Sequence, residues 1–267
     1  MKILVLLPAM VLSCAAAGLT QPPSLEDGYA QMYNRQFDEA HRTFRQWQAA
    51  HPANPLGPVS DAAAYLFSEL DRLRILQSEF FSEDHSFLKL HKPAADLHLK
   101  AEFELDLAQA DHLAAARPAE DTDAEFATVL EHGLHSDYLA LIEKRYVAAL
   151  SETKQGRTAA ERLLAAHPDC YDANLAIGVE NYLLSLKPAP VRLLLRAGGA
   201  ETDKQAGLEK LRLTAEKGHF LAPFARLLLA LAALRDRDYA GARAQLNWLA
   251  SRYPQNELYR EELAKVK

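Results

Sequence analysis

Six histidines stand among acidic residues between positions 82 and 136, and these are the side-chain types that bind zinc. Three such groups brought together in the fold would make a metal site that could support hydrolysis. His91 and His98 are seven residues apart, so they can share one face of a helix. The members of this group are His85, His91, His98, His112, His132 and His135, with Asp84, Asp96, Asp106, Asp111 and Glu131.

The pair His132 and His135 does not follow the pattern of a zinc protease. The order Glu-His-Gly-Leu-His differs from the His-Glu-x-x-His of those enzymes. Gly133 is expected to break the helix between the two histidines. We therefore interpret the histidines as surface residues of an acidic insertion, with a metal-dependent hydrolase in this segment as the alternative.

A second group of polar residues could bind a peptide. Asn174 and Asn181 are seven residues apart with Gly178 between them, so they align on one face of a helix. Side-chain amides in such a row can hydrogen-bond an extended peptide backbone, and Glu180 and Tyr182 stand beside them. The alternative is that these amides only satisfy neighbouring turns.

Motifs of the common enzyme classes are absent from the sequence. It contains no Gly-x-Ser-x-Gly, no Gly-x-x-x-x-Gly-Lys, no Gly-x-Gly-x-x-Gly and no Cys-x-x-Cys. Gly198 and Gly199 could offer free amides to an anion, but a flexible turn is the simpler interpretation. We expect no catalysis, no cofactor and no bound metal.

Helices must position these side chains, because a helix, a proline turn and a second helix recur at least three times. Ala-Ala-His-Pro ends at Pro52 and again at Pro168, and the same spacing applies around Pro254. Small or apolar residues twelve, eight and five positions before each proline predict a buried stripe on the first helix. These residues are Ala40, Phe44 and Trp47, then Gly156, Ala160 and Leu163, then Ala242, Leu246 and Leu249.

Capping and turn residues delimit the helices. Gly156 is expected to permit a turn after a helix from Asp137 to Thr153. No segment alternates as a strand would, so the sequence predicts an all-α protein. Helix starts are predicted at Ser24 with Asp27, at Ser60, at Thr122 with Glu125, and at Thr202 with Gln205.

The spacing of small and aromatic residues resembles tetratricopeptide repeats. Gly28, Ala40, Phe44 and Pro52 match the repeat pattern, and Ala62 begins the next unit thirty-four residues after Gly28. The resemblance implies a right-handed α-α superhelix, a solenoid with divergent or inserted helices, whose concave groove holds a peptide or protein. Repeat units are recognised near 24–67, 137–185 and 222–256, and the region 69–136 is divergent.

The same resemblance implies cationic partners for the asparagines. Grooves of this family pair such amides with Lys and Arg from neighbouring first helices to hold a carboxylate. Lys144 and Arg145 are the candidate partners here, beside Asn174 and Asn181.

The amino terminus has the layout of an export signal over residues 1–20, which leaves 21–267 as a single helical domain. One lysine precedes an apolar run from Ile3 to Leu12, and small residues follow. The stretch 11–14 also resembles the lipobox of bacterial lipoproteins, in which Cys14 would be lipidated. An ordinary cleavage site after 15–17 is the alternative, so an anchored lipoprotein and a soluble exported protein both stay open.

Charge is uneven along the chain. Residues 187–267 carry 15 Lys and Arg against 9 Asp and Glu, whereas residues 1–186 carry 15 against 27. The basic end could face an anionic polymer or lipid, or form a solvated helix face. Our leading hypothesis is a non-catalytic scaffold of the bacterial cell envelope, periplasmic or anchored to the outer membrane, that binds a protein or peptide and no nucleic acid.

Overall fold

The computed structural model describes residues 23–76 and 94–266, and all regular structure in these ranges is helical. They form twelve α-helices, one π-helical turn (Tyr138–Ile142) and one 3-10 turn (Tyr171–Ala173). The helices are α1 Leu25–Tyr33, α2 Phe37–Ala50, α3 Leu56–Arg72, α6 Leu97–Ala115, α7 Thr122–Asp137, α8 Tyr146–Ala166, α9 Asn174–Ser185, α10 Ala189–Ala197, α11 Lys204–Lys217, α12 Ala222–Arg235, α13 Tyr239–Arg252 and α14 Glu257–Lys265. The predicted all-α class is confirmed.

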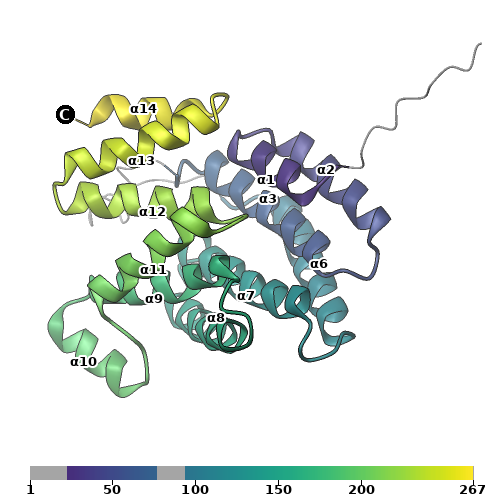
Figure 1. The fold of residues 1–267 in the computed structure, drawn as a ribbon, viewed down its shortest axis with the longest axis horizontal. Helices are drawn as coiled ribbons and strands as arrows, with labels where there is room; N and C mark the ends of the chain where they lie inside the picture. Colours follow the sequence, from purple (N-terminus) through teal and green to yellow (C-terminus); the bar gives the residue numbers. More distant parts are fainter. Residues whose placement is uncertain (1–22, 77–93, 267) are drawn as a thin grey trace, which may run out of the picture.

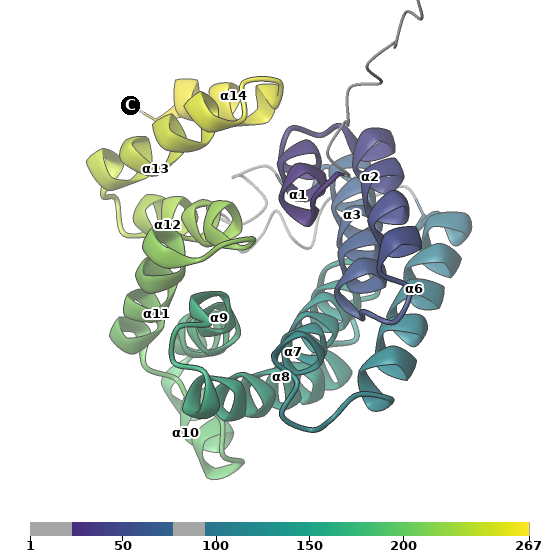
Figure 2. The same cartoon turned by 45° about the vertical axis from the view of Figure 1, so that its right-hand side comes forward.

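Helices that follow one another in the chain pack against one another, as in a superhelix (Figure 1). Figure 2 shows them along a curved path that runs from α1 and α2 through α7 and α8 to α13 and α14. Each pair buries the apolar stripe that neither helix could bury alone, which is how helical repeats gain stability.

The three proline turns predicted from the sequence join α2 to α3, α8 to α9, and α13 to α14. The residue before each proline ends its helix with nearly the same backbone: φ and ψ are −131° and 58° at His51, −129° and 78° at His167, and −125° and 68° at Tyr253. The stripe residues before these turns are buried, except Trp47, which is half-buried. The spacing therefore predicted both the turns and the packing faces.

Close approach between helices depends on glycine at two places. A side chain on Gly28 of α1 would overlap the ring of Phe44 on α2. Where α9 meets α11, a Cβ on Gly207 would lie 2.6 Å from the backbone nitrogen of Tyr182, and a Cβ on Gly178 would lie 3.1 Å from the Gly207 carbonyl oxygen. Such contacts are far inside van der Waals distance, so these helices touch backbone to backbone.

Several predicted helix boundaries were wrong. Helix α7 runs through Gly133 and α8 runs through Gly156, so neither glycine breaks a helix. The break comes between them, where a π-helical turn follows α7 and Lys144 takes a φ of 59°. Ser60 is not a cap: it lies inside α3, and its hydroxyl donates to the phenol oxygen of Tyr29 at 3.1 Å.

The other three predicted helix starts were correct to within one residue. Ser24 and Asp27 form the expected capping box. At the starts of α7 and α11 the caps are Asp121 and Asp203, each one residue away from the predicted threonine. An aspartate carboxylate accepts two backbone amides as readily as a threonine hydroxyl accepts one, so the neighbouring acid takes the role.

The two ends of the helical path meet. The Asn256 side-chain amide donates to the Tyr33 carbonyl oxygen at 2.9 Å, and the backbone N–H of Gln255 donates to the Asn34 side chain at 3.1 Å. The rings of Tyr33 and Tyr253 lie 5.4 Å apart between centroids. The first repeat is therefore in contact with the last.

No helix in the described ranges is long and apolar enough to cross a membrane.

Candidate functional site: the central cavity

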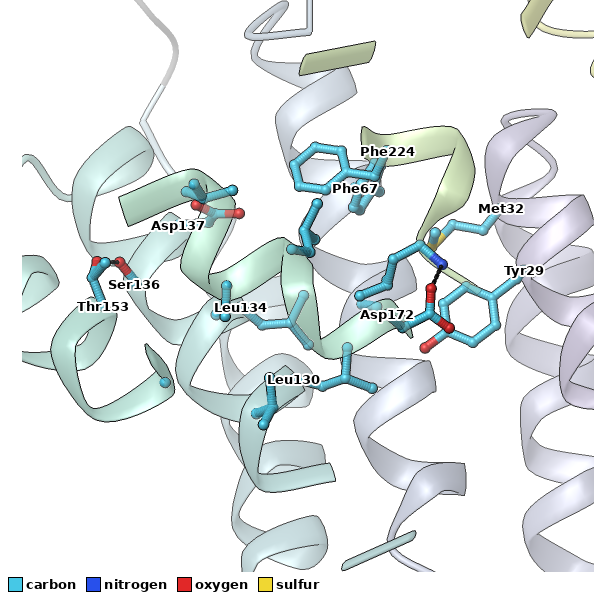
Figure 3. Close-up of a pocket in the computed structure, with 18 of the residues that line it drawn as sticks. Tyr29, Met32, Phe67, Leu130, Leu134, Ser136, Asp137, Thr153, Asp172 and Phe224 are labelled. Carbon is cyan, nitrogen blue, oxygen red and sulfur yellow. Dashed lines mark hydrogen bonds between the residues drawn. The ribbon is translucent and has the colours of Figure 1, made fainter. Parts of the chain in front are cut away.

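The inner side of the helical path contains an apolar cavity that is partly open to solvent (Figure 3). It offers about 90 Å³ to the centres of water-sized molecules. Side chains from α1, α3, α7, α8, α9 and α12 surround it, so it draws on both halves of the chain. Its principal apolar walls are Met32, Phe67, Leu130, Leu134, Val179 and Phe224.

Asp137, at the end of α7, brings a carboxyl group to this apolar surface. It follows Leu130 and Leu134 by seven and three residues, so the helical periodicity turns it to the same side. The carboxyl group of Asp137 forms no hydrogen bond and no ion pair with any described residue. Burial raises the pKa of Asp137 to about 7, because the apolar surroundings disfavour the charged form.

The other polar groups of the cavity are satisfied within the protein. The Ser136 and Thr153 hydroxyls lie 2.7 Å from each other, and both lie within 3.0 Å of the Ala149 carbonyl oxygen, so one can donate to that oxygen and the other to its neighbouring hydroxyl. Asp172, on the far side in Figure 3, accepts the backbone N–H groups of 219–221 at 2.9 to 3.0 Å. Asp137 is therefore the group of this cavity with hydrogen-bonding capacity to spare.

His132 and His135 both contact the carboxylate of Glu152 and are not part of a metal site in the described residues. Their Nδ1 atoms lie 2.8 Å and 3.7 Å from the two carboxylate oxygens of Glu152 on α8. In residues 23–76 and 94–266, no three His, Cys, Asp or Glu side chains gather as a metal ion requires. His85, His91 and Asp84 lie outside those ranges, so the hydrolase alternative stays untested.

The side chains predicted to line an open groove are buried instead. Asn174 is 2% exposed and Asn181 1% exposed, and Glu180 and Tyr182 are buried beside them. Their placement on an accessible face was therefore wrong, because α11 packs over this side of α9. The Asn181 side-chain amide donates to Glu201 at 2.7 Å, and its oxygen accepts the Asp203 N–H at 3.1 Å.

The cations that pair with this cluster are not the predicted ones. Lys144 and Arg145 lie at the turn before α8, where Arg145 pairs with Glu143 at 3.1 Å. Arg157, three turns further along α8, pairs with Glu180 at 2.9 Å. Lys210 of α11 donates to the Asn174 side-chain oxygen at 3.0 Å. These contacts join α8, α9 and α11 and give both asparagine side chains partners within the protein.

The described part of the chain contains one cysteine, Cys170, and its thiol is not reactive. Cys14 lies outside the described residues, so its lipidation stays a prediction. Cys170 sits in the turn before α9, and burial raises the pKa of its thiol to about 11. A thiol that stays protonated at neutral pH is a poor nucleophile, so Cys170 is best described as a packing residue of this turn.

Sequence reasoning missed Asp137, although a signal was available. A single acid stands at helical spacing after Leu130 and Leu134 and before the apolar run of 138–142. An isolated carboxylate in such a stripe is costly unless it has a role.

No protein-family model, curated protein or solved structure matches this chain.

Proposed function

We propose that this chain is a non-catalytic, tetratricopeptide-like scaffold of the bacterial cell envelope that binds a protein or peptide partner. The observation that carries the proposal is the central apolar cavity with its unpaired carboxyl group. The layout of the first twenty residues supports export to the envelope.

The mode of binding differs from an extended peptide lying on a row of amides. The amides of α9 are occupied, and the first and last repeats are in contact. A partner therefore engages the scaffold by inserting an anchor into the cavity. Interfaces commonly gain most of their affinity from one or two such buried anchors.

The chemistry of the cavity defines the anchor. The cavity volume of about 90 Å³ corresponds to several water molecules, because one water needs roughly 10–15 Å³ of such space. That space suits a large apolar side chain. Asp137 can accept a hydrogen bond from the anchor or from the adjacent partner backbone, so an apolar residue beside a donor group fits best.

Gly133 provides a direct test, because it lines the cavity and a Cβ there meets nothing within 4 Å. In Gly133→Leu the new side chain fills the cavity without displacing the helix. Ala108→Leu, on the exposed face of α6, adds the same bulk outside and is the matched control. Peptides displayed on phage are selected for binding to the wild-type protein. The affinity of each selected peptide for the wild type and the two variants is then measured by fluorescence anisotropy.

We expect the selected peptides to share a large apolar residue. Their affinity falls at least about tenfold in Gly133→Leu, because burial of such a side chain contributes roughly 1.5–3 kcal/mol. Ala108→Leu binds as the wild type does. Equal binding by Gly133→Leu would exclude the cavity as the site, and failure to select any peptide would count against the binding function itself.

A further inference from the structure

Helix α10 projects from the body of the protein and has no buried residue (Figures 1 and 2). Its main helix neighbour is α9. A short helix of nine residues is not stable in water on its own, and here no packed face supports it. The exposed side chains of α10 are therefore candidates for an interaction outside this chain.

The outer surface of α10 is apolar. Leu193 is 71% exposed and Leu194 75% exposed, and Val191 is exposed beside them. Leu183 of α9 and Leu186, which directly follows α9, are also exposed close by in the chain. Scattered single leucines on a surface are ordinary, but several exposed leucines on and next to a protruding helix indicate an interaction site.

Cations that have no acidic partner in the described part of the chain lie near these leucines in the sequence. Arg192 donates to the carbonyl oxygens of Ser185 and Lys187 at 3.4 and 3.0 Å, and Arg196 donates to the Thr202 hydroxyl at 2.6 Å. Neutral oxygens do not cancel the charge of a guanidinium group. Neither arginine forms an ion pair among the described residues.

Two lysines add to this charge. Lys187 is exposed and forms no ion pair in the described part of the chain, and Lys154 of α8 donates to the Gly198 carbonyl oxygen at 3.0 Å. The segment 187–200 contains no acidic residue. We call this surface the α10 tip, formed by Lys154, Leu183, Leu186, Lys187, Val191, Arg192, Leu193, Leu194 and Arg196.

We propose that the α10 tip docks on the surface of an anionic lipid bilayer. Exposed leucines enter the boundary between headgroups and acyl chains, while the surrounding cations attract the anionic headgroups. A second copy of this chain fits the same surface poorly, because a twofold contact would bring two sets of unpaired cations together. The proposal is independent of the ligand that occupies the central cavity.

The test is co-sedimentation of the full-length protein with vesicles. Vesicles of phosphatidylcholine are compared with vesicles of equal parts phosphatidylcholine and phosphatidylglycerol, so that charge-dependent binding is measured by the difference. The variant Leu193→Gln with Leu194→Gln removes the apolar surface, and no core contact is lost because α10 buries nothing. Leu97→Gln with Leu105→Gln is the matched control, since both leucines are exposed on α6 at the other end of the molecule.

Wild type and the α6 variant are expected to bind the anionic vesicles, and raised salt weakens that binding. The α10 double variant binds at least about tenfold more weakly. Lys187→Gln alone lowers binding to anionic vesicles roughly fivefold and leaves binding to neutral vesicles unchanged.

Three results would overturn the proposal. The first is equal binding to anionic and neutral vesicles by the wild type, and the second is unchanged binding by the α10 double variant. The third is a wild-type protein that forms a dimer in light scattering, becomes a monomer in the α10 double variant and does not bind the vesicles. A second copy would then cover the α10 tip instead of a membrane.

Discussion

Replacement of Asp137 by asparagine is expected to stabilise the protein at alkaline pH and to leave its stability nearly unchanged at acid pH. The carboxyl group lines an apolar cavity without a hydrogen-bond partner among the described residues. Asparagine has the same shape and carries no charge. The substitution therefore isolates the cost of holding a carboxylate in this place.

The magnitude follows from the pKa. Burial raises the pKa of Asp137 from 3.8 to about 7. Each pH unit is worth about 1.4 kcal/mol, so the whole shift corresponds to an upper value of about 4 kcal/mol, because Asp137 is partly exposed to the open cavity. Because the folded state binds the proton more tightly than the unfolded state, this contribution is intact below pH 3.8 and is lost as the pH rises to about 7. Well above pH 7 the wild type has lost all of the stability that the protonated Asp137 carboxyl group contributes.

Urea denaturation at pH 4 and at pH 8 measures the effect, with tryptophan fluorescence as the signal. The free energy of unfolding of Asp137→Asn should exceed that of the wild type by up to about 4 kcal/mol at pH 8 and by little at pH 4. Asp38→Asn, an exposed aspartate in the first turn of α2, is the control and should change stability by less than about 1 kcal/mol at both. If the gain from Asp137→Asn is the same at both pH values, the carboxyl group is not desolvated and the reasoning fails.

Three further substitutions test the packing by urea denaturation. Gly28→Ala should lose about 1–3 kcal/mol of stability, because the new methyl group overlaps the ring of Phe44; a loss near zero would mean that α1 and α2 separate easily. Gly133→Ala should gain about 1 kcal/mol, since the helix interior gains a better helix former in open space; no gain would indicate that α7 is broken there. Arg157→Met should lose about 3–5 kcal/mol by leaving the buried Glu180 carboxylate unpaired, and adding Glu180→Met should restore most of it. If the double variant is no better than the single one, the ion pair does not explain the loss.

The repeat could be predicted from the sequence because its positions obey sterics that act locally. Proline stops a helix wherever it falls after the first turn, and Ala40 and Phe44 mark a face by spacing alone. The three turns were found by this reasoning, and their backbone angles agree.

The breaks in α7 and α8 could not be placed in the same way. Glycine inside a helix costs only about 1 kcal/mol, which tertiary packing easily offsets, so Gly133 and Gly156 stay helical. The actual interruption is at Lys144, a residue with no turn propensity of its own. It adopts positive φ because α7 and α8 must fold back on each other.

The candidate site depended on contacts that spacing does not reveal. Asn174 and Asn181 do share a helix face, as predicted, but that face is covered by α11 from thirty residues later in the chain. The cavity is built by helices from both ends of the sequence, so no local pattern defines it. Asp137 could have been noticed as a lone acid in an apolar stripe, but only the three-dimensional structure shows that its carboxyl group has no partner among residues 23–76 and 94–266.

The contact between the first and last repeats changes how this protein must fold. An open solenoid can nucleate anywhere and unfold from its ends, since each repeat touches only its neighbours. Here the carbonyl oxygen of Tyr33 accepts a hydrogen bond from Asn256, which lies 223 residues later in the chain, so this bond cannot form until Asn256 has been synthesised. During synthesis α1 remains incompletely packed until the last helix emerges, and such long-range closure slows folding. The contact also stabilises both ends of the helical path against local unfolding. Loss of α14 would therefore destabilise α1 as well as the carboxyl-terminal helices.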